Sequence, residues 1–276
     1  MNRKSLKNIL KDLIPPYLLK SINKIMWSSR TYKSYEDAIK NADGYEYKLL
    51  TKVVVAKGKR FSKDFPNSKE IDLKSLRIFA GLAASINKNK LTIIDFGGGA
   101  GTHYFIAKSI FSQNIELDWR VVETPTMVAE AKKHNLENKE LRFFETVEIA
   151  SRNDEVDLIF ASSSIHYTSK PYDFLKTLAS VNAKVLMITR TPITDNPCVL
   201  LQRSTLSANG VGDLPRDLNI VDKVITYPAT MMDRQKVEEI CSTFGKICLR
   251  ILEDKAAFNS DKDSYDMWGY IVKKIN

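Results

Sequence analysis

The chain has 276 residues, 43% of them hydrophobic, and a formal net charge of +9. These values are typical of a folded protein with one large domain, or with a domain and an appendage. The longest apolar runs fall far short of the roughly 18 to 20 residues of a membrane span, and the proline-interrupted N-terminus lacks a signal-peptide pattern. The three cysteines have no CxxC spacing, so we expect no metal site, no disulfide framework and a cytoplasmic location.

The positive charge is concentrated at the start of the chain. Residues 1–60 hold 14 Lys/Arg against 5 Asp/Glu, whereas the remainder holds 28 of each. Within residues 1–28, apolar side chains at three-to-four spacing on either side of Pro15-Pro16 predict two short, lysine-rich amphipathic helices. Such helices can lie on an anionic membrane surface, dock on a partner, or pack on their own domain with the lysines in solvent. The same charge could contact nucleic acid, but we expect no such partner because no aromatic stacking platform or zinc module accompanies it.

Helices are also predicted for the rest of the first ninety residues. One helix is expected over residues 34–42, with Ser34 as its N-cap and Asp43-Gly44 at its end. Residues 45–89 are expected to be mostly helical, including a buried stripe over residues 68–86. We therefore predict a basic helical N-terminal extension over residues 1–89.

Short apolar strands alternate with helical segments from residue 91 onward. The expected strands are 91–96, 119–122, 141–144, 156–161 and 184–189, and the expected helices are 102–111, 124–134 and 171–180. This alternation predicts an α/β fold with a Rossmann-like, doubly wound, mostly parallel sheet over residues 90–276.

The regular alternation stops after residue 190. Residues 191–227 are rich in Pro, Asn, Asp and Gly, which suggests an insertion or lid near the carboxyl ends of the strands. A helix over 232–244, starting at Asp233, is followed by two strands, 245–254 and 265–273, that are expected to form an antiparallel hairpin at the sheet edge.

The most specific passage is residues 91–104, LTIIDFGGGAGTHY, in which a strand ends at an acidic residue and a glycine turn leads into a helix. Gly97, Gly99 and Gly101 allow backbone angles closed to other residues and let a ligand touch the main chain. Asp95 lies where open α/β sheets bind ligands, and could bind a cationic group or fix the glycine loop. Glu123 ends the next predicted strand, where a carboxylate can accept hydrogen bonds from both ribose hydroxyls.

This pattern occurs both in folds that bind a nicotinamide dinucleotide and in methyl-transfer folds, and three details distinguish the two. Thr102 departs from the small third residue of the dinucleotide fingerprint, and Asp95 would repel a pyrophosphate. The expected terminal hairpin points the same way. These features resemble the class I S-adenosylmethionine-dependent methyltransferases, whose first motif has this Asp-x-Gly-x-Gly-x-Gly shape and whose sheet ends in an antiparallel strand. The resemblance covers residues 91–274 and implies S-adenosylmethionine as cofactor.

A narrower resemblance extends over most of the chain. Its residues are Trp27, YEDA at 35–38, DGY at 43–45, IDFGGGAG at 94–101, VVE at 121–123 and ASSS at 161–164. This combination is similar to a bacterial methyltransferase family often found beside surface-polysaccharide genes. It implies a glycan-linked acceptor without identifying it.

The resemblance also implies a set of cofactor-binding residues. The first motif and the ribose-binding acid correspond to Asp95, Gly97, Gly98, Gly99, Gly101 and Glu123, and the neighbouring His103, Thr124 and Ser162 are added as residues beside the cofactor. After strand 141–144, Glu145 or Thr146 stands where the superfamily often has a residue beside the adenine. An ordinary surface turn explains that pair equally well.

Two residues are candidates on the acceptor side. His166 follows strand 156–161, and its imidazole could deprotonate an acceptor hydroxyl, unless it is a structural histidine bonded to a loop carbonyl. Arg190 ends strand 184–189, where it could bind an anionic acceptor or form a surface ion pair.

The sequence thus predicts an S-adenosylmethionine-dependent O-methyltransferase acting on a small or glycan-linked acceptor, with the basic N-terminus as possible contact to an anionic membrane. Two alternatives remain open. A catalytically silent methyltransferase-like binding subunit is compatible with the absence of an unambiguous base. A nicotinamide-dependent oxidoreductase is disfavoured by Asp95 and Thr102.

Overall fold

The computed structural model describes residues 30–43, 48–68, 70–71, 73–86, 89–111, 115–152, 155–260 and 263–275. The amphipathic helices predicted within residues 1–28 lie outside the described residues. The helices and short 3-10 turns are α3 (Tyr35–Ile39), α4 (Lys48–Ser68), η1 (Leu73–Leu76), α5 (Arg77–Ser85), α6 (Thr102–Ile110), α7 (Pro125–Lys133), α8 (Val147–Ala150), η2 (Ile165–Tyr167), α9 (Pro171–Ser180), η3 (Leu206–Ala208), η4 (Arg216–Leu218) and α10 (Arg234–Phe244). The strands are β1 (Thr31–Tyr32), β2 (Lys90–Phe96), β3 (Glu116–Val122), β4 (Leu141–Phe144), β5 (Val156–Ser162), β6 (Ala183–Thr194), β7 (Cys198–Thr205), β8 (Val224–Asp233), β9 (Lys246–Asn259) and β10 (Ser264–Lys273).

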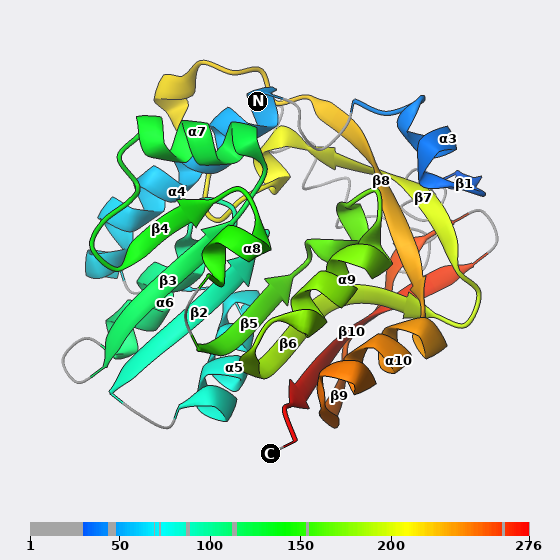
Figure 1. Cartoon of the computed structure of the whole chain (residues 1–276). Helices are drawn as coiled ribbons and strands as arrows, with labels where there is room; N and C mark the ends of the chain where they lie inside the picture. Colours follow the sequence, from blue (N-terminus) through cyan, green and yellow to red (C-terminus); the bar gives the residue numbers. More distant parts are fainter. Residues whose placement is uncertain are drawn as a thin grey trace, which may run out of the picture.

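The strands form a Rossmann-like sheet of the predicted kind (Figure 1). Its main part has the order β4-β3-β2-β5-β6-β10-β9, in which the strands from β4 to β6 are parallel and β10 runs antiparallel to both neighbours. The chain moves outward from β2 to β4 on one side, then returns to place β5 on the other side of β2. The carboxyl ends of β2 and β5 therefore form the topological switch point, where open α/β sheets bind ligands.

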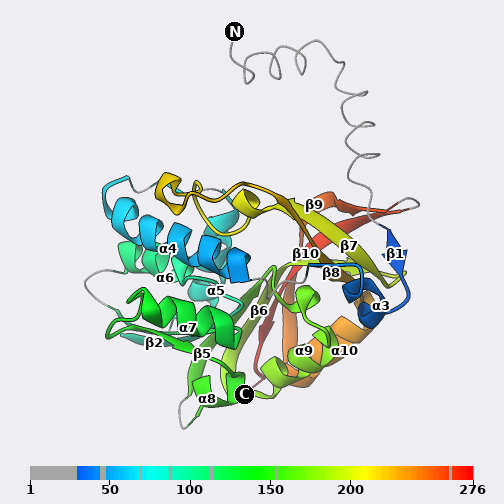
Figure 2. The same cartoon turned by 90° about the horizontal axis from the view of Figure 1, so that it is seen from above.

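Helices cover both faces of this sheet (Figure 2). Helices α4 to α7 pack on one face in a core that includes Leu82, Leu91 and Trp119. Helices α8, α9 and α10 pack on the other face in a second core that includes Ile94, Leu175 and Val237. Successive residues of β2 enter opposite cores, because side chains alternate along a strand and both faces are buried.

The segment predicted as an irregular insertion, 191–227, contains parts of three strands, which hold 16 of its 37 residues. β6 continues through Thr194, and β7 pairs antiparallel with β8 and with β1, so the three form an extension of the sheet. β6 joins the two parts, because it pairs with β10 over most of its length and with β8 at its last two residues. The sequence analysis missed these strands because they are stabilised by partners far away in sequence, which local composition does not report. The remaining residues, 195–197 and 206–223, form turns and the 3-10 helices η3 and η4. The role of the segment as an insertion or lid stays a prediction.

The segment before β2 is integrated with the sheet. Helix α4 contacts α6 and α7, and α5 contacts β5 and β6. The helix predicted over 68–86 is in fact broken: α4 ends at Ser68, and the chain resumes in η1 and α5. Ser34 caps α3 as predicted, since its side chain accepts a hydrogen bond from the N–H of Asp37, although the helix ends at Ile39. The domain boundary at residue 89 stays a prediction.

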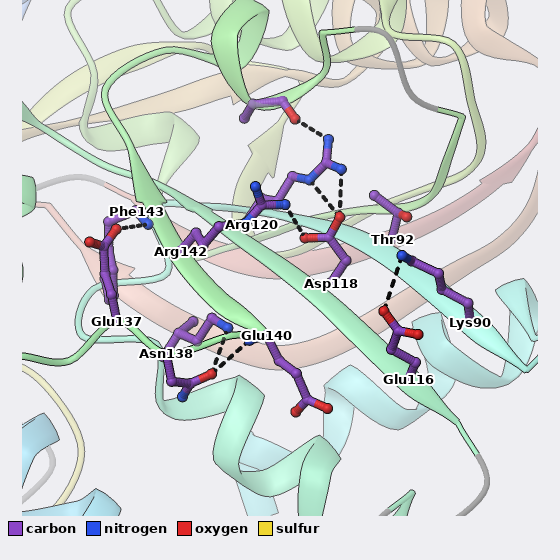
Figure 3. Close-up of polar contacts among 12 residues, drawn as sticks. Lys90, Thr92, Glu116, Asp118, Arg120, Glu137, Asn138, Glu140, Arg142 and Phe143 are labelled. Atoms are coloured by element: carbon purple, nitrogen blue, oxygen red, sulfur yellow. Dashed lines mark hydrogen bonds and ion pairs between the residues drawn. The ribbon is translucent and has the colours of Figure 1, made fainter.

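A buried charge network fixes the register of β3, the strand that carries Glu123 at its end (Figure 3). Arg120 donates to Asp118 Oδ2 at 2.5 Å and to the Ala150 carbonyl at 2.6 Å, and Arg142 on β4 donates to Asp118 Oδ1 at 2.6 Å. Burial alone would raise the pKa of Asp118, but these two guanidinium groups hold it below its ordinary value. The network thus joins β3, β4 and α8.

Among the described residues, no helix is both long and apolar enough to cross a membrane.

Helix α4 packs directly on the glycine turn, and Gly58 permits it: a Cβ at this position would lie 2.1 Å from Cβ of Ala100. We expect Gly58→Ala to lower the free energy of unfolding by about 1–3 kcal/mol through overpacking, although alanine favours a helix by about 1 kcal/mol. Urea denaturation measures this change. Lys52→Ala, at an exposed position of the same helix, is the control and should not destabilise. A Gly58→Ala protein as stable as the wild type would contradict the tight contact.

Candidate functional site

The glycine turn after β2 meets the loop after β5. Gly97 has a φ of +68°, and a Cβ on it would lie 2.2 Å from Cβ of Ser164. Only glycine fits there, because the backbone is left-handed and the neighbouring chain is in contact. The hydroxyl of Ser164 donates to the carbonyl of Phe96 at 2.9 Å. The two strand ends at the switch point are therefore fixed side by side.

Asp95 lies beneath this turn and is fully buried. Its Oδ2 accepts a hydrogen bond from Trp119 Nε1 at 3.1 Å and lies 3.2 Å from His103 Nδ1. The turn folds closely over the carboxylate, since a Cβ on Gly98 would lie 2.6 Å from its Cγ. Asp95 Oδ1 has no hydrogen-bond partner among the described residues. The carboxylate therefore orients His103 and retains one unused acceptor atom.

Glu123 extends from the end of β3 to the same turn. Its Oε1 accepts from the N–H of Gly99 at 3.0 Å, and its Oε2 accepts from the N–H of Thr124 at 3.0 Å. Burial raises the pKa of Glu123, the two backbone hydrogen bonds oppose this rise, and the charge of Asp95 adds to it. The carboxylate thus connects the strand end, the glycine turn and the start of α7.

Glu123, His103 and the glycine turn line a cavity of about 380 Å³, whereas the buried Asp95 does not reach it. One wall is the glycine turn with His103, Glu123 and Met127. The opposite wall comes from segments distant in sequence: Ser75, Ser162, Ser163, Tyr167, Arg190, Gln202, Ser204, Tyr227 and residues 208–212, with Val54 of α4 between the walls. A second, more open hollow on α10, lined by Asp195 and Arg234 among others, contains none of the predicted site residues.

A buried lysine holds a loop that contributes to the cavity lining. Lys57 on α4 is 2% exposed, and its ammonium donates to the carbonyls of Ser207, Asn209 and Gly210 at 2.8, 2.8 and 3.1 Å. Burial lowers the pKa of Lys57, and Asp213 and Asp222 oppose that change. Three carbonyls satisfy the three ammonium donors, so this charge fastens part of the predicted lid to α4.

His166, the predicted base, lies behind the cavity wall. It is fully buried, its ring contacts Tyr167 with centroids 4.0 Å apart, and neither ring nitrogen has a hydrogen-bond partner among the described residues. Burial, followed by the positive charge of Arg190, lowers the pKa of His166 to about 3. It is not among the residues that line the cavity, whereas Tyr167 is. The geometry therefore gives His166 no direct access to a substrate there.

The other predicted site residues divide into two groups. Gly97, Gly98, Gly99, His103, Glu123 and Ser162 line the cavity. Asp95 and Gly101 lie under the turn, and Thr124 caps α7 by accepting from the N–H of Met127. Glu145 is exposed, and Thr146 caps α8; both follow β4, the outermost strand on this side of the sheet, and neither lines the cavity. The binding role of each of these residues stays a prediction.

Sequence reasoning missed most of the far wall. Gln202, Ser204 and Tyr227 lie on β7 and β8, within the segment predicted to be irregular. The hydroxyl of Tyr167 donates to Gln202 Oε1 at 2.9 Å, and that of Tyr227 donates to Ser204 Oγ at 2.9 Å. No local motif marks these residues, because only the pairing of β7 with β8 brings them to the cavity.

No family model matches the sequence, and no curated protein matches it. Solved structures similar to the chain include an S-adenosylmethionine-dependent methyltransferase from Clostridium acetobutylicum, at 12% identity, TM-score 0.46, and coverage of 77% of this chain and 96% of that one. The [4+2]-cyclase SpnF aligns at 12% identity, TM-score 0.48, and coverage of 90% and 98%. The sugar N-methyltransferase KedS8 from Streptoalloteichus aligns at 12% identity, TM-score 0.43, and coverage of 78% and 92%. Because these TM-scores are below 0.5, we base the functional assignment on the site itself.

The burial of His166 predicts an acid-sensitive core. A histidine whose pKa is lower in the folded than in the unfolded protein contributes stability above its unfolded value of about 6.5, and loses it as the pH falls toward about 3. Within that window we expect wild-type stability to fall about 1.4 kcal/mol per pH unit more steeply than that of His166→Leu. Urea denaturation between pH 5 and 7 tests this.

Ile188→Val is the control, because Ile188 is fully buried and carries no ionisable group. It should keep the wild-type dependence on pH. Parallel curves for wild type and His166→Leu would show that folding does not lower the pKa of His166.

Proposed function

We propose that the cavity binds S-adenosylmethionine and that the protein is a methyltransferase. The observation that carries this proposal is the position of Glu123. Its carboxylate lies at the end of β3, in contact with the N–H of Gly99, within the cavity at the topological switch point. A carboxylate at this point suits the two hydroxyls of a ribose, which would replace or share its backbone hydrogen bonds.

The donor side of the cavity fits such a ligand in two further respects. The volume of about 380 Å³ falls within the range of about 300–1,000 Å³ for small-molecule sites. Asp95 Oδ1 is a buried acceptor without a partner among the described residues, and Asp95 disfavours a pyrophosphate by charge repulsion. A ligand bearing an ammonium and a sulfonium is therefore more compatible with this wall than a dinucleotide.

We infer that the acceptor is a hydroxyl of a small or glycan-linked molecule. The glycan part of this proposal rests on the sequence resemblance to polysaccharide-associated methyltransferases. When bound, S-adenosylmethionine supplies an electrophilic methyl group, and the residues of the chain must align the acceptor and remove its proton. As the acceptor oxygen forms its bond to the methyl carbon and the bond from carbon to sulfur breaks, the hydroxyl proton needs a base.

His103 is better placed than His166 to be that base. It lines the cavity, and its Nδ1 lies 3.2 Å from Asp95 Oδ2. With Nδ1–H donating to this carboxylate, Nε2 retains a lone pair that can take a proton. Asp95 would then hold the ring in the tautomer and orientation that the transfer needs.

Glu123 variants test the donor site. Glu123→Ala should weaken the binding of S-adenosylhomocysteine by at least about 10-fold in calorimetry, because each lost hydrogen bond to a charged group contributes about 1.5–3 kcal/mol. Glu123→Gln, which keeps one acceptor, should weaken it less. Glu148→Ala, an exposed carboxylate on α8, is the control. Unchanged affinity in both variants, or tighter binding of NAD by the wild type, would contradict the donor assignment.

His103 variants test the base. Once a screen has identified an acceptor, His103→Asn should slow single-turnover methyl transfer by about 100-fold or more, the usual effect of a general base, with little change in S-adenosylhomocysteine affinity. His166→Leu should retain most of the rate. If His166→Leu slowed methyl transfer and His103→Asn kept the wild-type rate, His166 rather than His103 would be the base.

A further inference from the structure

We propose that Arg190 recognises the acceptor and that the acceptor carries an anionic group, a carboxylate or a phosphate, at this point. This inference rests on the proposed function, whose donor wall is the glycine turn, and it concerns the opposite wall. Three features of the structure support it: the backbone conformation of Arg190, the charge balance around it, and the composition of the wall.

Arg190 has a left-handed backbone, with a φ of +53°, although it is not glycine. For such a residue this conformation is strained, so the surroundings must impose it. Glu253 on β9 does so: its Oε2 accepts from the N–H of Arg190 at 2.7 Å, and its Oε1 accepts from the hydroxyl of Thr189. Arg77 Nε pairs with the same carboxylate at 3.1 Å. The conformation is thus fixed by a charge network on three elements.

Glu253 reaches β6 across β10. Its side chain is 3% exposed, and it passes Gly269, where a Cβ would lie 2.6 Å from its Oε1. Burying a carboxylate is energetically costly unless it is paired and hydrogen-bonded, and here its partners are Arg77, the hydroxyl of Thr189 and the N–H of Arg190. We infer that Glu253 is a positioning residue, which sets the direction in which Arg190 leaves β6.

The charge of Arg190 is left uncompensated within the described part of the chain. No described carboxylate lies within ion-pair distance of its guanidinium, because Glu253 is engaged with Arg77 and the backbone. The guanidinium stays charged at any physiological pH, and its charge also acts on the neighbouring His166. A cation on the wall of a partly buried cavity is stabilised by an anionic ligand, which it can bind through two parallel hydrogen bonds.

The surrounding wall is polar and uncharged. Gln202, Ser204, Tyr167 and Tyr227 offer amide and hydroxyl groups, and the carboxylate in the lining, Glu123, belongs to the donor wall. These neutral groups suit the hydroxyl-bearing part of an acceptor, while Arg190 provides the charge that selects and orients it.

An anion bound by Arg190 would belong either to the acceptor or to the amino-acid carboxylate of the methyl donor. Two measurements on one set of variants distinguish these sources. First, S-adenosylhomocysteine binding is measured by calorimetry for the wild type, Arg190→Gln and Arg190→Lys. We expect all three affinities to agree within about threefold. A loss of 10-fold or more confined to Arg190→Gln would assign Arg190 to the donor and overturn the proposal.

Second, acetate, inorganic phosphate and the neutral acetamide are titrated at constant ionic strength and followed by NMR of the backbone amides, which are present in every variant, with and without S-adenosylhomocysteine. We expect both anions to bind the wild type at least 10-fold more tightly than acetamide. Arg190→Gln should remove this preference, and Arg190→Lys should keep part of it. Arg203→Gln, an exposed arginine on β7, is the matched control and should behave as the wild type.

Equal binding of acetate and acetamide, or an anion preference that survives in Arg190→Gln, would refute the anionic acceptor. A wild type that does not bind S-adenosylhomocysteine would refute the proposed function instead. The anion titration of the ligand-free protein would still decide the role of Arg190 in that event.

Discussion

The contact between the carboxylate of Glu123 and the N–H of Gly99 is the interaction on which the rest of the site depends. It joins the end of β3 to the glycine turn after β2, so two strand ends and the start of a helix share one ligand-facing surface. The turn can approach the carboxylate because its glycines adopt left-handed angles and leave no Cβ in the way. The buried Arg120–Asp118 pair fixes the register of β3, and therefore the position of Glu123 relative to the glycine turn.

The two walls of the cavity are built on different physical principles. The wall that contains the glycine turn comes from two consecutive strand–turn–helix units, β2 to α6 and β3 to α7. The far wall is assembled from distant segments and is held by buried charges, Lys57 on the carbonyls of residues 207–210 and Glu253 on the backbone of Arg190. Buried ions of this kind require good geometry and full hydrogen bonding, and they fix one arrangement of the chain among many.

The two histidines illustrate how burial decides chemistry. His166 and His103 both stand beside strand ends that face the switch point, and the sequence favoured His166 as the base. In the fold, the side chain of His166 lies in the core beside Tyr167 and Phe258, where desolvation favours its neutral form. His103 instead lines the cavity with a carboxylate behind its ring. The same residue type is thus enclosed in the core in one place and faces the cavity in the other.

The sequence by itself determined the parallel sheet, the glycine turn and the acidic residues at the ends of β2 and β3. These features are local, since apolar periodicity and glycine angles act within a few residues. It also predicted the terminal hairpin and the cap of α10 at Asp233.

Only the tertiary structure decided that residues 198–205 and 224–233 are paired strands, that Gln202 and Tyr227 reach the cavity, and that Arg190 is held by Glu253. Those outcomes depend on partners tens of residues away. Their stability comes from long-range pairing and buried charge, which leave no periodic signal in the local sequence.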